Sequence, residues 1–323
     1  MFAARTVFAW LCAGGLAFAA PTHTVYRTGS AEDARPASVR PGLLLAGGGG
    51  DVDEAFRWLL SLAPGGDVVV LRASGADGYN AYLHGEIGGV NSVTSIVFHT
   101  AEAARDPDVL AALARAEIVF LAGGDQARYV SFWRDGPVGA ALNAHAAAGK
   151  PLGGTSAGLA VLGEHYFSAD RDTITSAEAL RDPFDPKVTL GTDFLSLPAL
   201  RGVLTDSHFS ERERLGRLIV FLARLGATAP GPVAGLGLDE ATALCVEADG
   251  TARVVTARAG RAWLVRITGT TARLEAGRPL SVSGVEVTGL GPDSRLHLPG
   301  LAVTGAAERR TVAVIDGRLT DSP

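Results

Sequence analysis

Hydrophobic residues gather in short runs without polar alternation, and each run is followed by glycine and then by a segment of helical period. The runs over residues 43–46, 67–71 and 117–121 are apolar almost throughout, which is typical of strands buried on both faces of a sheet. Residues 52–62 have apolar positions three and four apart, as on one face of a helix. This alternation predicts an α/β domain with a mostly parallel sheet and helices on both faces.

Three glycine-rich turns follow predicted strands, at residues 47–50, 123–124 and 153–158. Ligands of open α/β sheets bind beyond the carboxyl ends of the strands. Because all three turns come at such ends, the sequence predicts a functional site at that edge of the sheet.

The pattern changes from Gly235 onward, where short runs rich in Val, Leu and Thr are separated by Gly and Asp. This is typical of antiparallel strands. We therefore predict an α/β domain over residues 42–247, followed by residues 248–323 as added edge strands and a small β-rich C-terminal appendage.

The N-terminus has the pattern of an export signal. Arg5 precedes an apolar run over residues 6–18, and Ala17-Phe18-Ala19 fits the small-x-small cleavage rule. Residues 1–19 are predicted to be a signal peptide, with an uncleaved anchor as the alternative. The apolar run is short for a membrane span. We expect a secreted protein, periplasmic or extracellular, that has no membrane contact after cleavage.

Composition narrows the class of protein. Of 323 residues, 47% are hydrophobic, enough to bury a core, and the net charge of −5 comes from mixed acidic and basic residues. The basic stripe of a nucleic-acid-binding protein is missing, so no nucleic-acid partner is predicted. Residues 20–41 are polar and without period, and we predict a mobile leader there. After signal removal Cys245 is the one cysteine left, and its apolar neighbours indicate a buried thiol.

Ser156 lies in Gly154-Thr155-Ser156-Ala157-Gly158, which matches G-x-S-x-G. In that motif the nucleophile occupies a strained turn between a strand and a helix, with its side chain aimed outward. The N–H of Ala157 would then point at a developing oxyanion. An ordinary serine in a glycine-rich turn is the alternative, but the position between a strand and an apolar helix favours a nucleophile.

A serine nucleophile needs a base, usually histidine. His208 differs from the other histidines because it follows an extended run, in a polar turn that leads into a helix. The base in turn needs an orienting acid, for which Asp239 and Glu240 are candidates. Capping of a turn is the alternative role for these two acids.

Three arginines open the helix after His208. Arg214 and Arg217 lie close to one another on a helical wheel and could share a carboxylate target. The alternative is a solvated helix face with ion pairs to Glu211 and Glu213.

Four motifs together carry a resemblance to a known family. Residues 122–126 (AGGDQ), 153–158 (GGTSAG), 206–217 (DSHFSERERLGR) and 235–243 (GLGLDEATA) resemble the cyanophycinase family of serine peptidases, relatives of dipeptidase E, over residues 42–247. The specific part is D-x-H-F-S-x-R-x-R-L-G-R. The resemblance implies a flavodoxin-like fold, related to class I glutamine amidotransferases, and a Ser-His-acid peptidase without metal or cofactor.

The resemblance also implies a role for each matching residue. Ser156 would be the nucleophile, His208 the base and Glu240 the third member of a triad. The N–H of Ala157, with that of Gly124 or its neighbour Gly123, would form the oxyanion hole. The remaining matching polar residues would form the substrate pocket: Gln126, Asp206, Arg212, Arg214 and Arg217.

The family's best-known substrate is cyanophycin, multi-L-arginyl-poly-L-aspartate, which is cut to β-Asp-Arg dipeptides. Arginines of the pocket would hold backbone carboxylates of the polymer, and Asp206 would hold a substrate guanidinium. Ser207 stands where cyanophycinases have glutamine. The shorter side chain alters the pocket wall, which extends the expected substrates to related aspartyl and isoaspartyl peptides.

Two other functions are open from the sequence. An α/β-hydrolase-type esterase shares G-x-S-x-G but expects the order Ser, acid, His, whereas the order here is Ser156, His208, Glu240. A non-catalytic exported protein could use the arginines to bind acidic peptides, but the presence of all three catalytic residues favours a peptidase. The number of subunits stays open, with a homodimer as one option.

Overall fold

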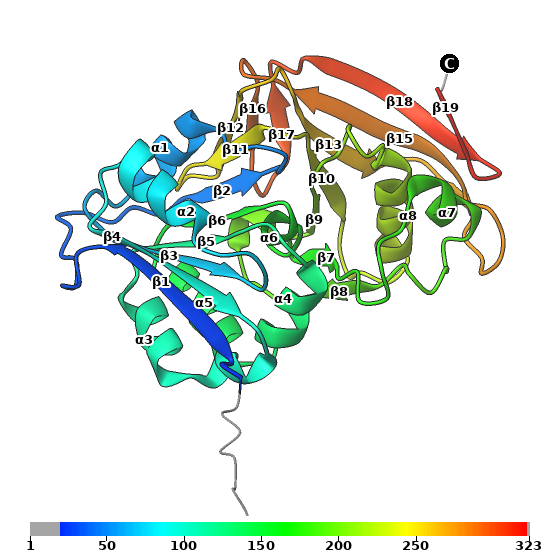
Figure 1. The fold of residues 1–323 in the computed structure, drawn as a ribbon. Coiled ribbons are helices and arrows are strands. Elements are labelled where there is room, and N and C mark those ends of the chain that lie inside the picture. Colours follow the sequence, from blue (N-terminus) through cyan, green and yellow to red (C-terminus); the bar gives the residue numbers. More distant parts are fainter. Residues whose placement is uncertain (1–19, 322–323) are drawn as a thin grey trace, which may run out of the picture.

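The computed structural model describes residues 20–321, in which the strands form one ten-stranded and one nine-stranded sheet (Figure 1). The predicted signal peptide, residues 1–19, lies outside the described residues. No helix of the described part is long and apolar enough to cross a bilayer.

The ten-stranded sheet has the spatial order β1 (His23–Gly29), β4 (Ser92–Phe98), β3 (Asp67–Arg72), β5 (Ile118–Leu121), β6 (Leu152–Thr155), β2 (Leu43–Ala46), β11 (Thr242–Val246), β12 (Thr251–Thr256), β16 (Arg295–His297) and β17 (Ala302–Thr304). The nine-stranded sheet has the order β19 (Arg318–Asp321), β18 (Glu308–Ile315), β15 (Ser281–Leu290), β13 (Ala262–Ile267), β10 (Ala234–Leu238), β9 (Val203–Asp206), β7 (His165–Phe167) and β8 (Leu190–Thr192), with β14 (Thr271–Arg273) paired to β15.

The helices are α1 (Asp53–Ser61), α2 (Gly78–Ala81), α3 (Pro107–Arg115), α4 (Gln126–Trp133), α5 (Pro137–Ala147), α6 (Ala157–Ala160), α7 (Ser176–Arg181) and α8 (Leu215–Gly226). Shorter turns are π-helical at Tyr82–Ile87 and 3₁₀-helical at Ala101–Arg105 and Pro198–Leu200.

The centre of the ten-stranded sheet is parallel, over β4, β3, β5, β6 and β2. Val68 and Val70 of β3 pack with α1 on one face, whereas Val69 and Leu71 pack with α3 and α5 on the other. Both faces are apolar because each is covered by helices. The prediction of an α/β fold with a mostly parallel sheet is confirmed.

Residues 23–29 correct the prediction of a mobile leader over 20–41. They form β1, which pairs antiparallel with β4 from His23 opposite Phe98 to Gly29 opposite Ser92. An edge strand bonds to a neighbour on one side only, and its outer residues face water, as Val25 does. It therefore lacks the continuous apolar run by which the buried strands are recognised.

The residues after 247 are β-rich, as predicted, and they are divided between the two sheets. β12, β16 and β17 extend the first sheet beyond β11, while β13, β15, β18 and β19 extend the second beyond β10. The predicted boundary at residue 247 falls in the turn of the β11–β12 hairpin. Cys245 of β11 is buried, as predicted, and burial raises the pKa of its thiol to about 12.

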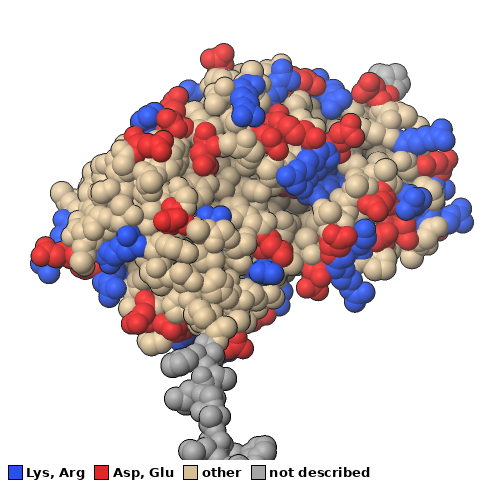
Figure 2. Space-filling view, in the orientation of Figure 1, with Lys and Arg blue, Asp and Glu red and all other residues tan. Residues whose placement is uncertain are grey.

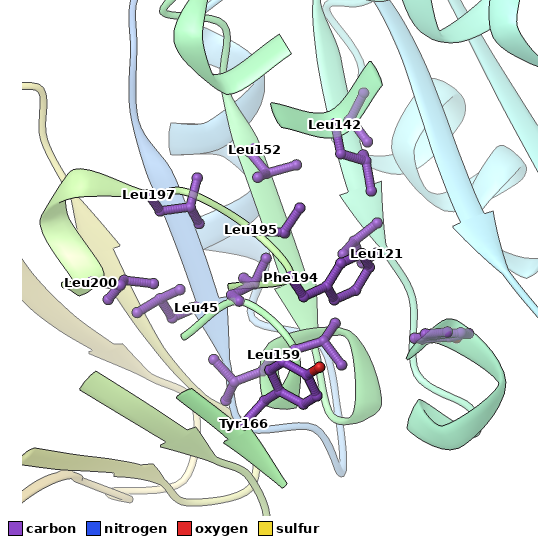
Figure 3. Close-up of a cluster of buried hydrophobic side chains, with 14 of the residues drawn as sticks. Leu45, Leu121, Leu142, Leu152, Leu159, Tyr166, Phe194, Leu195, Leu197 and Leu200 are labelled. Carbon is purple, nitrogen blue, oxygen red and sulfur yellow. The ribbon is translucent and has the colours of Figure 1, made fainter. Parts of the chain in front are cut away.

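One apolar cluster joins the two sheets. Figure 3 shows Leu45, Leu121 and Leu152 of the first sheet in the same cluster as Leu159 of α6 and Tyr166 of β7. All five are fully buried, and burying a side chain of this size contributes about 1.5–3 kcal/mol. The cluster therefore fixes α6, and the residue before it, relative to both sheets.

Candidate active site

Three loops at strand ends bring the predicted triad together. Ser156 directly follows β6, His208 comes two residues after β9, and Glu240 comes two residues after β10. β9 and β10 are parallel neighbours, so the loops that follow them leave the same edge of the sheet. Figure 2 shows a hollow in this face, over the region where Figure 1 draws α6 between the sheets, with basic and acidic side chains beside it.

The three side chains form one hydrogen-bonded row. The Oγ of Ser156 lies 2.8 Å from Nε2 of His208, and Nδ1 of His208 lies 2.7 Å from Oε1 of Glu240. When Glu240 accepts the Nδ1–H, the Nε2 lone pair is free to accept the Ser156 proton. This is the geometry of a Ser-His-acid nucleophile.

Two of these residues have strained backbones. Ser156 has φ 53° and ψ −114°, and His208 has φ 44°. A side chain in such a region costs about 1–3 kcal/mol, and strain of this kind clusters at functional sites. Ser156 is held there by hydrogen bonds from its N–H to the carbonyl of Ala46 (3.1 Å) and from Ala160 to its own carbonyl (3.0 Å).

The predicted oxyanion donors lie around Ser156. Ala157 is the first residue of α6, so its N–H has no partner within the helix. Gly123 lies against Ser156: a Cβ added to Gly123 would be 3.9 Å from the Ser156 Oγ. Gly124 packs instead near the Tyr129 hydroxyl, 2.8 Å from an added Cβ. Of these two glycines, Gly123 therefore lies closer to the serine, and which of them supplies the second N–H stays a prediction.

The glycine run at 47–50 lies beside the candidate site, as its position at a strand end predicted, but its packing against the three side chains was not predicted. Gly48, with φ +88°, lies so close to the triad that an added Cβ would be 2.6 Å from His208 Cε1 and 3.0 Å from Ser156 Cβ. Gly49 lies in the same way against the Glu240 carboxyl group, and the carbonyl of Gly47 accepts from the His208 N–H at 2.9 Å. The run therefore forms the wall against which the triad packs. Repeated glycines after a strand were its one signal in the sequence.

The structure separates the two acids that the sequence offered. Asp239 is buried, and its carboxylate accepts from Trp263 Nε1 (3.0 Å) and from the N–H groups of Ser210 and Arg261. It holds the loop and does not face His208. Glu240 faces the histidine with its side chain 25% exposed.

The electrostatic surroundings keep His208 available as a base. Burial lowers the pKa of His208 below its ordinary value of 6.5, and the nearby Arg212 and Arg214 act in the same direction, against the bond to Glu240. The imidazole is therefore neutral near pH 7, which is the form that can accept a proton.

Asp206 and Arg217 do not lie where the sequence predicted. Asp206 Oδ2 accepts from Arg217 Nε at 2.9 Å, and Oδ1 accepts from Arg214 Nη1 at 3.0 Å. The side chains of Asp206 and Arg217 are 4% and 3% exposed. Burial acts to raise the pKa of Asp206, but Arg217 and Arg214 together hold it below its ordinary value. The prediction that Asp206 and Arg217 contact substrate is corrected, because each already neutralises the other beneath the surface.

The other predicted pocket residues differ in whether their side chains are already hydrogen-bonded within the protein. Arg214 also donates to the carbonyl of Ser207 at 2.7 Å, so it braces the loop before the triad histidine. Gln126 is half-buried and donates to the carbonyl of Phe167 at 2.9 Å. Arg212 is exposed, and its guanidinium has no ion pair or hydrogen bond within residues 20–321. Of the predicted pocket arginines, Arg212 is the one free to meet a ligand.

Comparisons with known proteins agree with these motifs. Residues 82–254, which include all three members of the row, match the model of peptidase family S51. The cyanophycinase of Synechococcus elongatus is 37% identical over 168 residues, or 52% of this chain and 48% of that protein. The chain thus spans about half the length of that relative. The cyanophycinase of Trichormus variabilis is 31% identical over 226 residues, or 68% of this chain and 70% of that protein.

A solved structure extends the likeness to the fold. The crystal structure of a peptidase from an acI-B1 Actinobacterium superposes with a TM-score of 0.51 at 15% identity, covering 85% of this chain and 98% of that one. The family model and the two cyanophycinases confirm the family resemblance predicted from the motifs, while the solved structure shows the likeness of the fold alone.

Proposed function

Because this chain belongs to peptidase family S51, we propose that it is a serine-type peptidase that hydrolyses cyanophycin or related aspartyl and isoaspartyl peptides. The observation that carries the proposal is the row of Ser156, His208 and Glu240, joined by contacts of 2.8 and 2.7 Å. The sequence relatives named cyanophycinase support the substrate class.

In this mechanism the Ser156 Oγ attacks the scissile carbonyl while His208 Nε2 takes its proton. The N–H of Ala157 and that of Gly123 or Gly124 stabilise the oxyanion. The imidazolium then gives its proton to the leaving amine, which departs and leaves an acyl ester on Ser156. His208 next takes a proton from water, the hydroxide attacks the ester, and the acid product is released with Ser156 restored.

The charges around the row suit an acidic backbone. Arg212 is exposed and close enough to His208 to lower its pKa. A guanidinium at this position can pair with an aspartyl carboxylate of the substrate.

The strand order supports a flavodoxin-like relationship for the first sheet. The order β4-β3-β5-β6 corresponds to 2-1-3-4 of the flavodoxin order 2-1-3-4-5. The fifth place is taken by β2, which precedes the other four in the chain. We propose that the fold is a flavodoxin-like sheet with this strand drawn from the other end of the sequence.

Export completes the proposal, on the basis of the signal pattern in residues 1–19. N-terminal sequencing of protein recovered from the periplasm or medium should find Ala20 as the first residue. A chain that still begins at Met1 would refute cleavage.

Cyanophycin digestion tests the catalytic proposal. Wild type should release β-Asp-Arg dipeptides, detected by mass spectrometry, and Ser156→Ala should lose at least about 10³-fold in rate. Ser131→Ala, at an exposed serine of α4, is the matched control and should be unchanged. Equal rates for wild type and Ser156→Ala would refute the mechanism. Binding without products would favour the acidic-peptide-binding alternative, and hydrolysis of short-chain esters alone would favour the esterase.

A further inference from the structure

The burial of Asp206 leaves no assigned partner for a cationic group of the substrate. Several other carboxylates on loops around Ser156 are also engaged. Glu240 accepts from His208, and Asp239 accepts from three donors. Asp125 caps α4 through the N–H of Ala127 at 2.9 Å and lies 3.7 Å from Arg128. None of these is free to bind a cation.

Asp51, directly after the glycine run 47–50, is different. It is exposed, and its Oδ1 accepts from the Tyr79 hydroxyl at 3.0 Å. Within the described part of the chain no cationic group lies within ion-pair distance of it. Helix α1 begins two residues later without any side-chain cap, so capping does not explain Asp51 either.

Chain length limits how far Asp51 can lie from the triad. A Cβ built at Gly48 would clash with His208 and Ser156, and three residues span at most about 11 Å, so Asp51 lies within that distance of Gly48. The ring of Tyr79 packs on Phe120 of β5, with 5.2 Å between centroids. Two extended residues of a peptide substrate bound at Ser156 reach about 7 Å, and a long arginine side chain on the substrate extends farther. A substrate cation can therefore cover the distance to Asp51.

The carboxylate of Asp51 is poised for a cation. Desolvation by the surrounding protein raises its pKa above the ordinary value, as does the neighbouring Asp53, and the Tyr79 hydroxyl opposes them. A carboxylate that has no cation beside it gains from pairing with one. Its Oδ1 is fixed by Tyr79, and its Oδ2 has no partner within residues 20–321.

Resting on the proposed function, we propose that Asp51 binds a guanidinium or ammonium group of the substrate and so selects peptides that carry a basic side chain. Arg212 would hold an acidic group and Asp51 a basic one. The site would then recognise both charges of an arginine-bearing aspartyl chain.

The chain offers a matched control two residues away. Asp53 accepts from the Tyr82 hydroxyl at the same 3.0 Å, but it is paired with Arg57 at 3.1 Å in α1. Asp53→Asn therefore removes one negative charge next to a tyrosine hydroxyl, as Asp51→Asn does. It differs because Asp53 is already paired with an arginine. Asparagine at either position can still accept from the tyrosine, which keeps the fold intact.

The experiment compares synthetic (β-Asp-Arg)₃ with its uncharged isostere (β-Asp-citrulline)₃ as substrates. Asp51→Asn should lower kcat/KM for the arginine peptide about 10- to 100-fold, mainly through KM, because the charge-assisted hydrogen bond to the guanidinium is lost. For the citrulline peptide kcat/KM should change less than about threefold, and Asp53→Asn should change kcat/KM of either peptide by less than about threefold. Equal losses on both peptides, or no loss on either, would overturn the proposal.

Measurements of peptide binding to variants that lack the Ser156 hydroxyl test the Asp51 site independently of the catalytic proposal. The Kd of both peptides is measured by calorimetry for Ser156→Ala and for the Ser156→Ala, Asp51→Asn double variant. The second change should weaken the arginine peptide alone, by the same 10- to 100-fold. If Ser156→Ala hydrolyses cyanophycin as fast as wild type, the proposed function fails, and the Kd ratio still decides whether Asp51 binds the cation. An unchanged ratio would refute the Asp51 site even if hydrolysis is confirmed.

Discussion

Replacement of Gly48 by alanine should disable the triad while the protein stays folded. The new methyl carbon would lie 2.6 Å from His208 Cε1, about 0.8 Å inside the 3.4 Å at which ordinary contact begins. A shift of the backbone cannot easily relieve the clash, because the N–H of His208 donates a hydrogen bond to the carbonyl of Gly47, the residue before Gly48. The imidazole must therefore move away, and with it the contact to Ser156.

The magnitude follows from that displacement. A misplacement of about 1 Å at a catalytic group can cost about 100-fold in rate. The positive φ of +88° at Gly48 adds a folding penalty of about 1–2 kcal/mol for any residue with a Cβ. We expect kcat/KM to fall about 100-fold and the Tm to fall by a few degrees.

Gly65 separates these two effects. It has φ +73°, and an added Cβ would meet no atom within 4 Å. Gly65→Ala should carry the same backbone penalty in thermal unfolding but keep wild-type kcat/KM. If Gly48→Ala keeps activity within threefold of Gly65→Ala, the packing of the glycine run against the triad is not what positions His208.

Three further predictions follow from the charges of the site. Glu240→Gln should lower kcat about 10⁴-fold with little change in Tm, because the amide favours the wrong imidazole tautomer; a loss under tenfold would contradict this role. Arg212→Gln removes a cation that lowers the pKa of His208, so the acid limb of the kcat/KM profile, where activity rises as the imidazole loses its proton, should move to higher pH; an unmoved or lower limb would refute the coupling. Asp206→Asn should destabilise the protein by about 3–5 kcal/mol in urea unfolding, because it leaves Arg217 buried without its partner; a change under about 1 kcal/mol would show that Asp206 is dispensable to the fold.

The sequence could predict a candidate site residue where that residue's conformation depends on its own neighbours. Ser156 was predicted to lie in a strained turn because the residues on both sides are small, and its φ of 53° confirms the strained turn. His208 was singled out by its position in a polar turn between an extended run and a helix, whereas Glu240 was chosen through the family motif, since nothing in the local pattern distinguishes Glu240 from Asp239. In the structure, Asp239 instead binds Trp263 and two backbone N–H groups.

The errors share a different cause. Whether Asp206 and Arg217 face a ligand or each other depends on the rotation of β9 against α8, which spacing along the chain does not reveal. The closeness of Gly48 to His208 depends on two sheets meeting. The edge strand β1 is held by backbone hydrogen bonds to β4. Its side-chain pattern therefore does not mark it as a strand.

The division of the last quarter of the chain between both sheets has a consequence for truncation. A stop codon after residue 247 would remove β12 from beside β11 and β13 from beside β10, baring two rows of backbone N–H and C=O groups on either side of Glu240. Unpaired strand edges of this kind form hydrogen bonds with the strands of other copies and so promote aggregation. A shortened gene would therefore be expected to yield inclusion bodies, and not a smaller working enzyme.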